Sequence, residues 1–272
     1  MLKMASFLYF FVTIFLFIII ALWVYGFLTA NDLTIPQKRI HEIAQKYKTI
    51  LVVFPHADDE FFTAGGLMSH MARNDASVYW AVITQGGKGN PTGVDDPQLK
   101  KVRVEEARRA GKVYGVKKIL QMNYPDGAVD KHIPELQRDL RTVMQKVKPD
   151  LVITYDLSGL YGHPDHIVTS RILTTLLQRK FKKTTVWYAS FPVKFMEKIQ
   201  FPTHMAKNKT FVDKRSTPSF RVWVGLRGVL NKIKVVYIYK SQAPFSKSRP
   251  IKILPVWFYV SFLFYEYFYE TE

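Results

Sequence analysis

Two short clusters of histidine and acidic residues stand far apart in this chain but share a spacing. One reads Pro-His-Ala-Asp-Asp-Glu and contains His56 and Asp59, and the other reads Gly-His-Pro-Asp-His and contains His163 and His166. Residues three positions apart project from about the same face when a helix begins there. Imidazole and carboxylate groups in such an arrangement are typical metal ligands. The two clusters therefore indicate a metal site that is divided between two segments of the chain.

A zinc ion in a hydrolytic site has three protein ligands and keeps one position for water. Two histidines and one aspartate from the clusters would provide that number. Water bound to zinc has a pKa of about 7, so a neighbouring carboxylate can take its proton. Asp58 suits that task, because it adjoins Asp59 but points away from the ligand face. Another divalent ion that accepts nitrogen and oxygen ligands would also fit.

Each of these residues taken alone has a structural interpretation. A single histidine at the end of a strand is commonly hydrogen bonded, and an aspartate at the start of a helix commonly caps it. We interpret Asp165 in this way, as a cap or as a partner of a ligand. The joint pattern of the two clusters is harder to explain by capping. The histidines that stand alone are interpreted as structural, and they are His41, His70, His132 and His204.

The elements around the clusters predict an α/β fold. Each cluster follows an apolar run that is typical of a buried strand, residues 49–54 and 150–155. Alternating strands and helices predict right-handed crossovers and a mainly parallel sheet covered on both faces, with ligands at the carboxyl ends of its strands. Further predicted strands span residues 78–84, 118–123, 184–190 and 235–239, the helices span 61–73, 97–114, 134–147 and 165–179, and a glycine-rich loop spans 85–96. The aromatic stretch 253–269 is expected to pack on the core rather than to form a second membrane contact.

The first 30 residues differ from the rest, because no charged residue lies between Lys3 and Asp32. About 20 apolar residues in a helix span the bilayer core. We therefore expect residues 1–30 to be a retained transmembrane anchor rather than a cleaved signal peptide, with a linker and leading helix at 31–48 and the catalytic domain at 49–272. More basic residues follow the span than precede it, which predicts that the catalytic domain lies on the cytoplasmic side.

The net charge of +17 is concentrated in one region. Residues 171–252 contain 19 Lys and Arg against two acidic residues, so the whole excess belongs to this segment. Beside a membrane anchor, such a basic segment favours anionic membrane lipids as a partner over nucleic acid. The alternative is a solvated lysine-rich surface. The chain has no cysteine, which excludes disulfides, thiolate metal sites and thiol nucleophiles. The oligomeric state is left open.

The clusters resemble the motifs of the PIG-L or LmbE-like de-N-acetylases, which usually read Pro-His-Pro-Asp-Asp-Glu and His-Pro-Asp-His. The resemblance implies a Rossmann-like fold and zinc-dependent removal of acetyl groups from N-acetylglucosamine-containing compounds. It also implies that His56, Asp59 and His166 bind zinc and that Asp58 is the general base. His163 would stabilise the oxyanion or protonate the leaving amine.

Weaker similarities extend this resemblance. Ala57 replaces the usual proline, from which we expect a softened turn and retained activity. Arg103 and Glu106 match an Arg-x-x-Glu helix, and Asp126 lies in a Pro-Asp-Gly turn. The resemblance implies substrate contacts for Arg103 and Asp126. The alternatives are an ion pair between Arg103 and Glu106 and a purely structural turn.

With its anchor and basic segment, the chain is expected to act on a lipid-linked substrate such as N-acetylglucosaminyl phosphatidylinositol. Two alternatives remain open at this stage. One is a membrane-tethered basic binding protein with a degenerate site, and the other is a metallo-phosphohydrolase.

Overall fold

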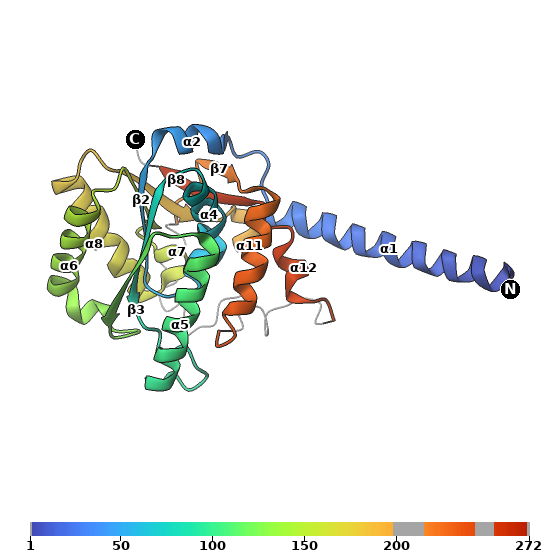
Figure 1. The fold of residues 1–272 in the computed structure, drawn as a ribbon, viewed down its shortest axis with the longest axis horizontal. Coiled ribbons are helices and arrows are strands. Elements are labelled where there is room, and N and C mark those ends of the chain that lie inside the picture. The colour runs from blue at the N-terminus through green and yellow to red at the C-terminus, as the bar shows by residue number, and fades with distance from the viewer. Residues whose placement is uncertain (1, 198–214, 243–252, 271–272) are drawn as a thin grey trace.

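The computed structural model describes residues 2–197, 215–242 and 253–270, and its centre is an eight-stranded sheet (Figure 1). The strand order is β1-β7-β8-β6-β5-β2-β3-β4. Neighbouring strands pair in parallel except β8, which is antiparallel to both β6 and β7. The strands are β1 (Gln37–Lys38), β2 (Thr49–Phe54), β3 (Ser77–Thr84), β4 (Lys118–Tyr124), β5 (Leu151–Tyr155), β6 (Thr185–Ser190), β7 (Phe220–Trp223) and β8 (Tyr265–Glu270). The α/β class is confirmed, and the sheet is mixed.

Alternating side chains of β2 divide the hydrophobic core into two layers. Leu51 and Val53 pack on the face covered by α6 and α8, whereas Ile50, Val52 and Phe54 pack on the face covered by α4, α5 and α11. Both faces of β2 are therefore buried, as expected for a central parallel strand. The helices are α1 (Leu2–Ala30), α2 (Ile40–Lys46), α3 (Asp59–Thr63), α4 (Gly65–Arg73), α5 (Pro97–Tyr114), α6 (Ile133–Val147), α7 (Gly159–Gly162), α8 (Pro164–Lys180), α9 (Val193–Met196), α11 (Gly225–Ile238) and α12 (Val256–Val260).

Two predicted elements are wrong. The single helix predicted at 61–73 is two helices, α3 and α4, which are separated at Ala64. The new helix start is stabilised because the Glu266 carboxylate on β8 accepts hydrogen bonds from the backbone N–H groups of Gly66 and Leu67. The strand predicted at 235–239 belongs to helix α11, whose buried residues recur at helical spacing. A short run of β-branched residues is typical of a strand when the helical spacing of the buried residues around it is not considered.

Most of the aromatic stretch 253–269 packs on the core, as predicted, but Ile253 and Trp257 at its start are exposed. It forms α12 and then β8, which fills the gap between β6 and β7 in the sheet. His204 and parts of the basic segment, residues 198–214 and 243–252, lie outside the described residues.

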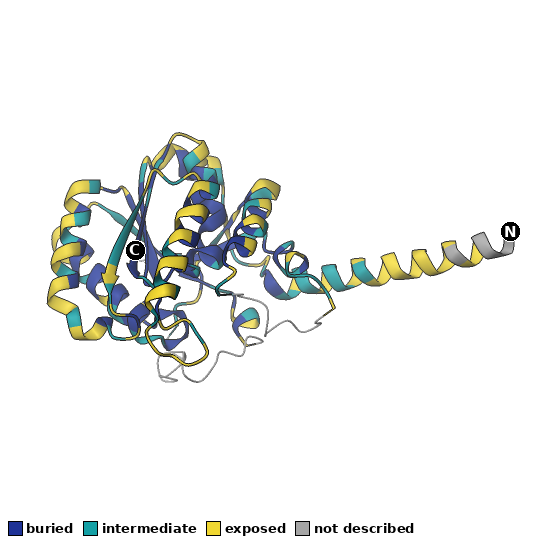
Figure 2. Ribbon diagram, turned by 60° about the horizontal axis from the view of Figure 1, so that its bottom comes forward, coloured by how far each residue is buried: buried dark blue, intermediate teal, exposed yellow. Residues whose placement is uncertain are grey.

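Helix α1 extends from the domain as a long rod (Figures 1 and 2). Residues 9–30 are long and apolar enough to cross a membrane, a criterion that a signal sequence near an N-terminus also meets. The described side chains before Ile19 are exposed, whereas the last turns contact the domain. The helix is thus joined to the domain by packing and not only by the chain.

Candidate metal centre and active site

The fold brings both clusters to the carboxyl ends of two adjacent strands. His56 and Asp59 follow β2, and His163 and His166 follow the neighbouring β5 at the start of α8. Parallel strands end at the same edge of a sheet, so segments 110 residues apart in sequence meet there. His56, Asp59 and His166 are all buried at this edge. The sequence-based prediction that the clusters form one site is consistent with this geometry.

The side chains of His56, Asp59 and His166 form a compact triangle. Nδ1 of His56 lies 3.2 Å from Nε2 of His166. The Asp59 carboxylate lies 3.4 Å from Nε2 of His166 through Oδ1 and 3.5 Å from Nδ1 of His56 through Oδ2. Zinc bonds of about 2.0–2.1 Å in a tetrahedral arrangement separate neighbouring ligand atoms by roughly 3.3 Å. The observed distances match that separation.

The far nitrogens of both imidazoles face hydrogen-bond acceptors. Nε2 of His56 lies 3.1 Å from Oδ1 of Asp126 and 3.3 Å from Oδ2 of Asp165. Nδ1 of His166 lies 3.2 Å from the carbonyl oxygen of Gly159. We assign the imidazole protons to these two nitrogens, because only a donor satisfies the oxygens opposite them. The lone pairs of the other two nitrogens then point at each other and at the Asp59 carboxylate.

Such a convergence of lone pairs and negative charge requires a cation. Burial by itself would lower the pKa of His56, but its hydrogen bonds with Asp126 and Asp165 raise that pKa well above the usual value. A proton can thus occupy the position in place of a metal, and the two compete. The residues present fit a zinc ion, because metal-binding histidines usually donate their second ring N–H to a carboxylate or a backbone carbonyl group.

Asp59 is better placed than His163 to be the third ligand. His163 offers a ligand atom within 4.8 Å of those of His56 and His166. The Asp59 oxygens are closer to both nitrogens, and they are fixed by the backbone N–H of His56 at 2.9 Å and the Tyr155 hydroxyl at 3.1 Å. Burial would raise the pKa of Asp59, but His166 and His56 hold it well below its usual value. Asp59 is therefore an anion ready to bind a cation.

Asp58 projects next to this triangle from a strained backbone. Its φ of 110° lies in the left-handed region, and its backbone N–H donates to the Glu60 carboxylate at 3.0 Å. A carboxylate oxygen of Asp58 lies 3.5 Å from Nη2 of Arg103. Burial raises the pKa of Asp58 to about 6, although Arg103 opposes the shift. A carboxylate of raised pKa beside a metal site can accept a proton at neutral pH.

One ring nitrogen of His163 is held by a backbone hydrogen bond. Its Nδ1 accepts a hydrogen bond from the backbone N–H of Asp165 and caps α8. The proton of the neutral ring therefore lies on Nε2. Burial, together with His166 and His56, lowers the pKa of His163 to about 3, so the ring is neutral at physiological pH.

The expected substrate residues also have structural partners. Arg103 is buried and donates to the carbonyl oxygens of Ala57 at 2.6 Å and Gly86 at 3.2 Å. The alternative pair with Glu106 is not found, because Glu106 instead accepts from Ser241. Arg103 thus fixes the segment that holds Ala57 and Asp58.

Asp126 and Asp165 both support His56. Besides its contact with His56, Asp126 accepts a hydrogen bond from the backbone N–H of Lys88 in the glycine-rich loop. Asp165 accepts from the backbone N–H groups of Gly127 and Val129 and is not the cap of α8. This position agrees with the prediction that Asp165 is a hydrogen-bond partner of the metal ligand His56.

Sequence reasoning missed three further residues of the site. Tyr155 stacks on His166 with ring centroids 4.5 Å apart. Glu60 is fully buried, and the Tyr239 hydroxyl donates to it at 2.6 Å. Tyr155 was detectable as a polar residue at the end of a buried strand, whereas the partnership of Glu60 with Tyr239 joins segments 179 residues apart.

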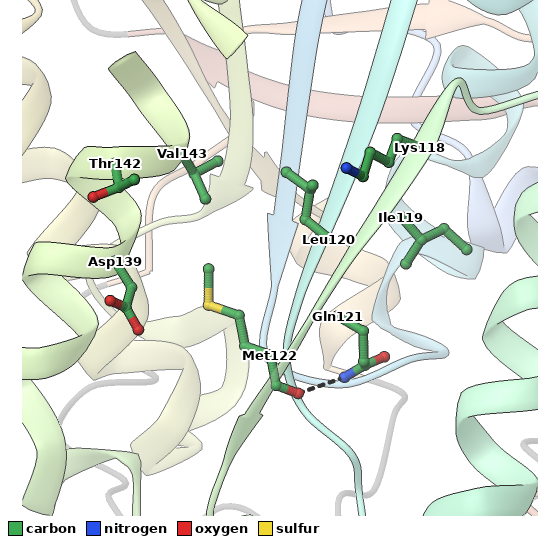
Figure 3. A pocket seen from close by; sticks show the side chains of 8 residues that line it. All are labelled: Lys118, Ile119, Leu120, Gln121, Met122, Asp139, Thr142 and Val143. Atoms are coloured by element: carbon green, nitrogen blue, oxygen red, sulfur yellow. Dashed lines mark hydrogen bonds between the residues drawn. The ribbon is translucent and has the colours of Figure 1, made fainter. Parts of the chain in front are cut away.

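Two cavities lie near the sheet edge, and only one touches the site. A groove of about 400 Å³ between β4 and α6 contains no residue of the two clusters (Figure 3). A second cavity of about 290 Å³ includes Asp126 and is lined by Lys88, Lys100 and Tyr124. Asp126 thus borders this second cavity and also contacts His56 of the candidate metal centre.

A family model matches the part of the chain that contains this candidate site. Residues 51–177, which contain both clusters, match the family model described as PIG-L, GlcNAc-PI de-N-acetylase. The chain carries a PIG-L family domain. The PIG-L domain begins within β2 and ends within α8, so it spans the metal centre and leaves out α1 and the distal strands.

Curated relatives of the PIG-L domain are deacetylases. A probable N-acetyl-alpha-D-glucosaminyl L-malate deacetylase of Bacillus anthracis is 27% identical over 61% of this chain and 76% of its own length. The diacetylchitobiose deacetylase of Thermococcus kodakarensis is 31% identical over 47% of this chain. The match spans about half of that relative, 48% of its length.

A solved structure shares the fold over most of the chain. The N,N'-diacetylchitobiose deacetylase of Pyrococcus horikoshii has a TM-score of 0.58 and 20% identity, and the match covers 84% of this chain and 85% of the other. The hydratase GalB of Pseudomonas putida shares the fold too, with a TM-score of 0.53 and 17% identity. Because the fold accommodates a hydratase, function must be argued from the site.

Proposed function

We propose that this protein is a zinc-dependent hydrolase that removes the acetyl group from an N-acetylglucosamine-containing substrate. The observation that carries the proposal is the triangle of His56, Asp59 and His166, with Asp58 beside it. The PIG-L family match and the deacetylase relatives support the reaction class.

Each residue of the site has a role in amide hydrolysis. A Zn²⁺ ion held by His56, Asp59 and His166 would lower the pKa of a water molecule and polarise the acetyl carbonyl group. Asp58 takes the proton from the attacking water, whose oxygen forms a bond to the acetyl carbon. The C–N bond then breaks, acetate leaves, and the nitrogen leaves as a free amine after gaining a proton.

The geometry favours one of the two roles expected for His163. Its Nδ1 already accepts a hydrogen bond, and its ring is neutral, so Nε2–H is available as a hydrogen-bond donor. A neutral donor stabilises an oxyanion but is a poor source of a proton. We therefore assign oxyanion stabilisation to His163 and proton delivery to the amine to Asp58, which has gained the proton from water.

The cavity beside Asp126 is the proposed site of the sugar and of the group attached to it. It is lined by Lys88 and Lys100, although Lys100 pairs with Asp95 at 2.5 Å. Its position next to the metal centre supports a substrate contact for Asp126 at the cavity and an indirect one for Arg103 through Asp58. The helix α1 favours a lipid-linked substrate over a freely soluble one.

Substitution of Asp58 tests the proposal. Asp58→Asn should leave zinc content nearly intact and reduce deacetylation at least about a hundredfold, since general base catalysis contributes 10²–10⁴-fold. His166→Ala should instead lower zinc content. Acetate release from N-acetylglucosaminyl phosphatidylinositol and from N,N'-diacetylchitobiose, together with metal analysis, measures both effects. Full activity of the Asp58 variant would contradict its assignment as the base.

The same assay distinguishes two other functions. Release of phosphate without acetate would indicate a metallo-phosphohydrolase. Absence of both products, with zinc bound, would indicate a binding protein with a degenerate site. The buried ligands and the raised pKa of Asp58 favour the deacetylase.

A further inference from the structure

Helix α1 is fixed to the domain by specific contacts at its C-terminal end. Nε1 of Trp23 donates to Oγ of Ser261 at 2.8 Å, and Nδ2 of Asn31 donates to the carbonyl oxygen of Phe262 at 2.8 Å. Gly26 packs so closely that a Cβ atom there would lie 2.6 Å from the Phe262 ring. The contacts join the first helix to a segment more than 200 residues away in sequence.

The packed residues of α1 form one stripe at helical spacing. They join a small hydrophobic cluster around Phe258, Phe262 and Leu263 that also includes residues of α9 and α12. The α1 members of that cluster are Ile19, Leu22, Trp23, Phe27 and Ala30. Before Ile19 the described side chains of α1 are exposed. The described part of the helix before Ile19 is therefore exposed, and its inner part from Ile19 to Ala30 is docked on the domain.

The docked residues of α1 lie within its candidate membrane span. That span covers residues 9–30, and the docked residues run from Ile19 to Ala30. About 20 apolar residues are needed to cross the hydrocarbon core of a bilayer, so residues 9–18 cannot provide the crossing without the docked turns. A helix that crosses with this span therefore brings its first docked turn, Ile19 to Leu22, to the bilayer.

The domain surface at that level is apolar and aromatic. Ile253 is 90% exposed and Trp257 is 46% exposed, and both flank residues that pack against α1. On α9, which also contacts α1, Val193 is 43% exposed and Lys194 beside it is exposed. Figure 1 shows α12 beside the base of α1, on the side of the domain from which α1 extends. Tryptophan and lysine in such positions are typical of a membrane interface.

We propose that Ile253, Trp257 and Val193 form an interfacial membrane contact, in which α12 and α9 lie in the headgroup boundary while α1 crosses the bilayer. The partner is a lipid bilayer, because the apolar helix leaves the domain through this same patch. Because α1 is packed on the domain, its direction in the bilayer then fixes the orientation of the domain on the membrane. The inference requires that α1 enters a bilayer, and it is independent of the proposed deacetylation.

Single cysteines with a polarity-sensitive fluorophore test the contact. The chain has no cysteine of its own, so one substitution gives one labelled position. Ile253→Cys and Trp257→Cys report on the patch, and Ile14→Cys, at a 41% exposed residue of α1, reports on insertion of the helix. Ile133→Cys is the matched control, because Ile133 is 42% exposed on α6 at the opposite side of the domain (Figure 1).

The full-length protein is placed in phosphatidylcholine vesicles, with and without phosphatidylserine, that carry spin-labelled acyl chains. The label at positions 253 and 257 should shift its emission to shorter wavelength and be quenched several-fold more than the label at position 133. Quenching at position 14 should be strong as well.

Three results would overturn the proposal. If positions 253 and 257 behave like position 133 while position 14 is quenched, the domain stands away from the bilayer and the patch has no lipid contact. If position 14 is not quenched, α1 does not enter the bilayer and the premise is wrong. If the emission at 253 and 257 shifts without quenching, and the shift disappears on dilution of the protein in the membrane, the patch contacts a second copy of the chain and not lipid.

Discussion

The carboxylates behind His56 should control the affinity of the metal centre. Asp126 and Asp165 contact Nε2 of His56 at 3.1 and 3.3 Å and orient its Nδ1 toward the metal position. Asp126 also accepts the Lys88 N–H at 2.9 Å, so both of its oxygens are in use. In Asp126→Asn the amide retains one acceptor oxygen, and either His56 or Lys88 loses its partner.

The expected loss of zinc affinity depends on how many carboxylates still contact His56. Loss of one such outer partner typically weakens metal binding 10–100-fold, which is about 1.4–2.7 kcal/mol. Because Asp165 still contacts His56, the Asp126→Asn variant should lie near the lower end of this range. The double variant with Asp165→Asn should lose more than the two single effects combined, since both carboxylates act on the same imidazole.

Zinc affinity is measured by competition of metal-free protein with a chromophoric chelator. Asp139→Asn is the matched control, because Asp139 also accepts a side-chain hydrogen bond, from the Tyr124 hydroxyl at 2.7 Å, but is not among the carboxylates that contact His56. Thermal unfolding of the metal-free proteins separates an effect on the site from an effect on folding. Wild-type zinc affinity in the Asp126 variant, or an equal loss in the Asp139 variant, would refute the reasoning.

Three other predictions concern stability and packing. Lys232→Met should lower the free energy of unfolding, measured in urea, by about 3–5 kcal/mol, because it leaves the buried Glu266 without its ion-pair partner at 2.7 Å. Lys234→Met, at an exposed site on the same helix, is the control and should have little effect. Gly26→Leu should displace Phe262 and broaden spin-label distances between α1 and the domain, whereas unchanged distances would show that the close packing is dispensable. Zinc at a hundred times its Kd should stabilise the protein by about 2.7 kcal/mol in thermal unfolding, and no shift in Tm would argue against a site in the folded state.

Much of the fold is predictable because local patterns and tertiary structure agree. Strand β2 and helix α5 have the predicted bounds, residues 49–54 and 97–114. In α5 the reason is local: Asp96 caps the start, and Gly115, with φ of 74°, adopts the left-handed conformation that ends the helix. The incorrect prediction of a strand at 235–239 shows that a short apolar run is too short to reveal a helical or strand periodicity.

The sequence by itself determined the chemistry of the site. Both clusters follow buried strands, and a parallel sheet must bring the ends of such strands to one edge. Ligand types and spacing predict a divided metal site, and the family resemblance implies His56, Asp59 and His166 as its ligands, so this prediction needed no coordinates. The long apolar helix at the N-terminus is also evident from composition.

Only the tertiary structure decided how these groups are oriented and supported. Asp126 follows β4 and contacts His56 after β2, although β3 lies between these two strands, and no local pattern encodes that contact. The same holds for Glu60 with Tyr239 and for Trp23 with Ser261. Hydrogen bonds and close packing depend on distances of a few ångströms between segments far apart in the chain, and these distances are set only when the whole core is assembled.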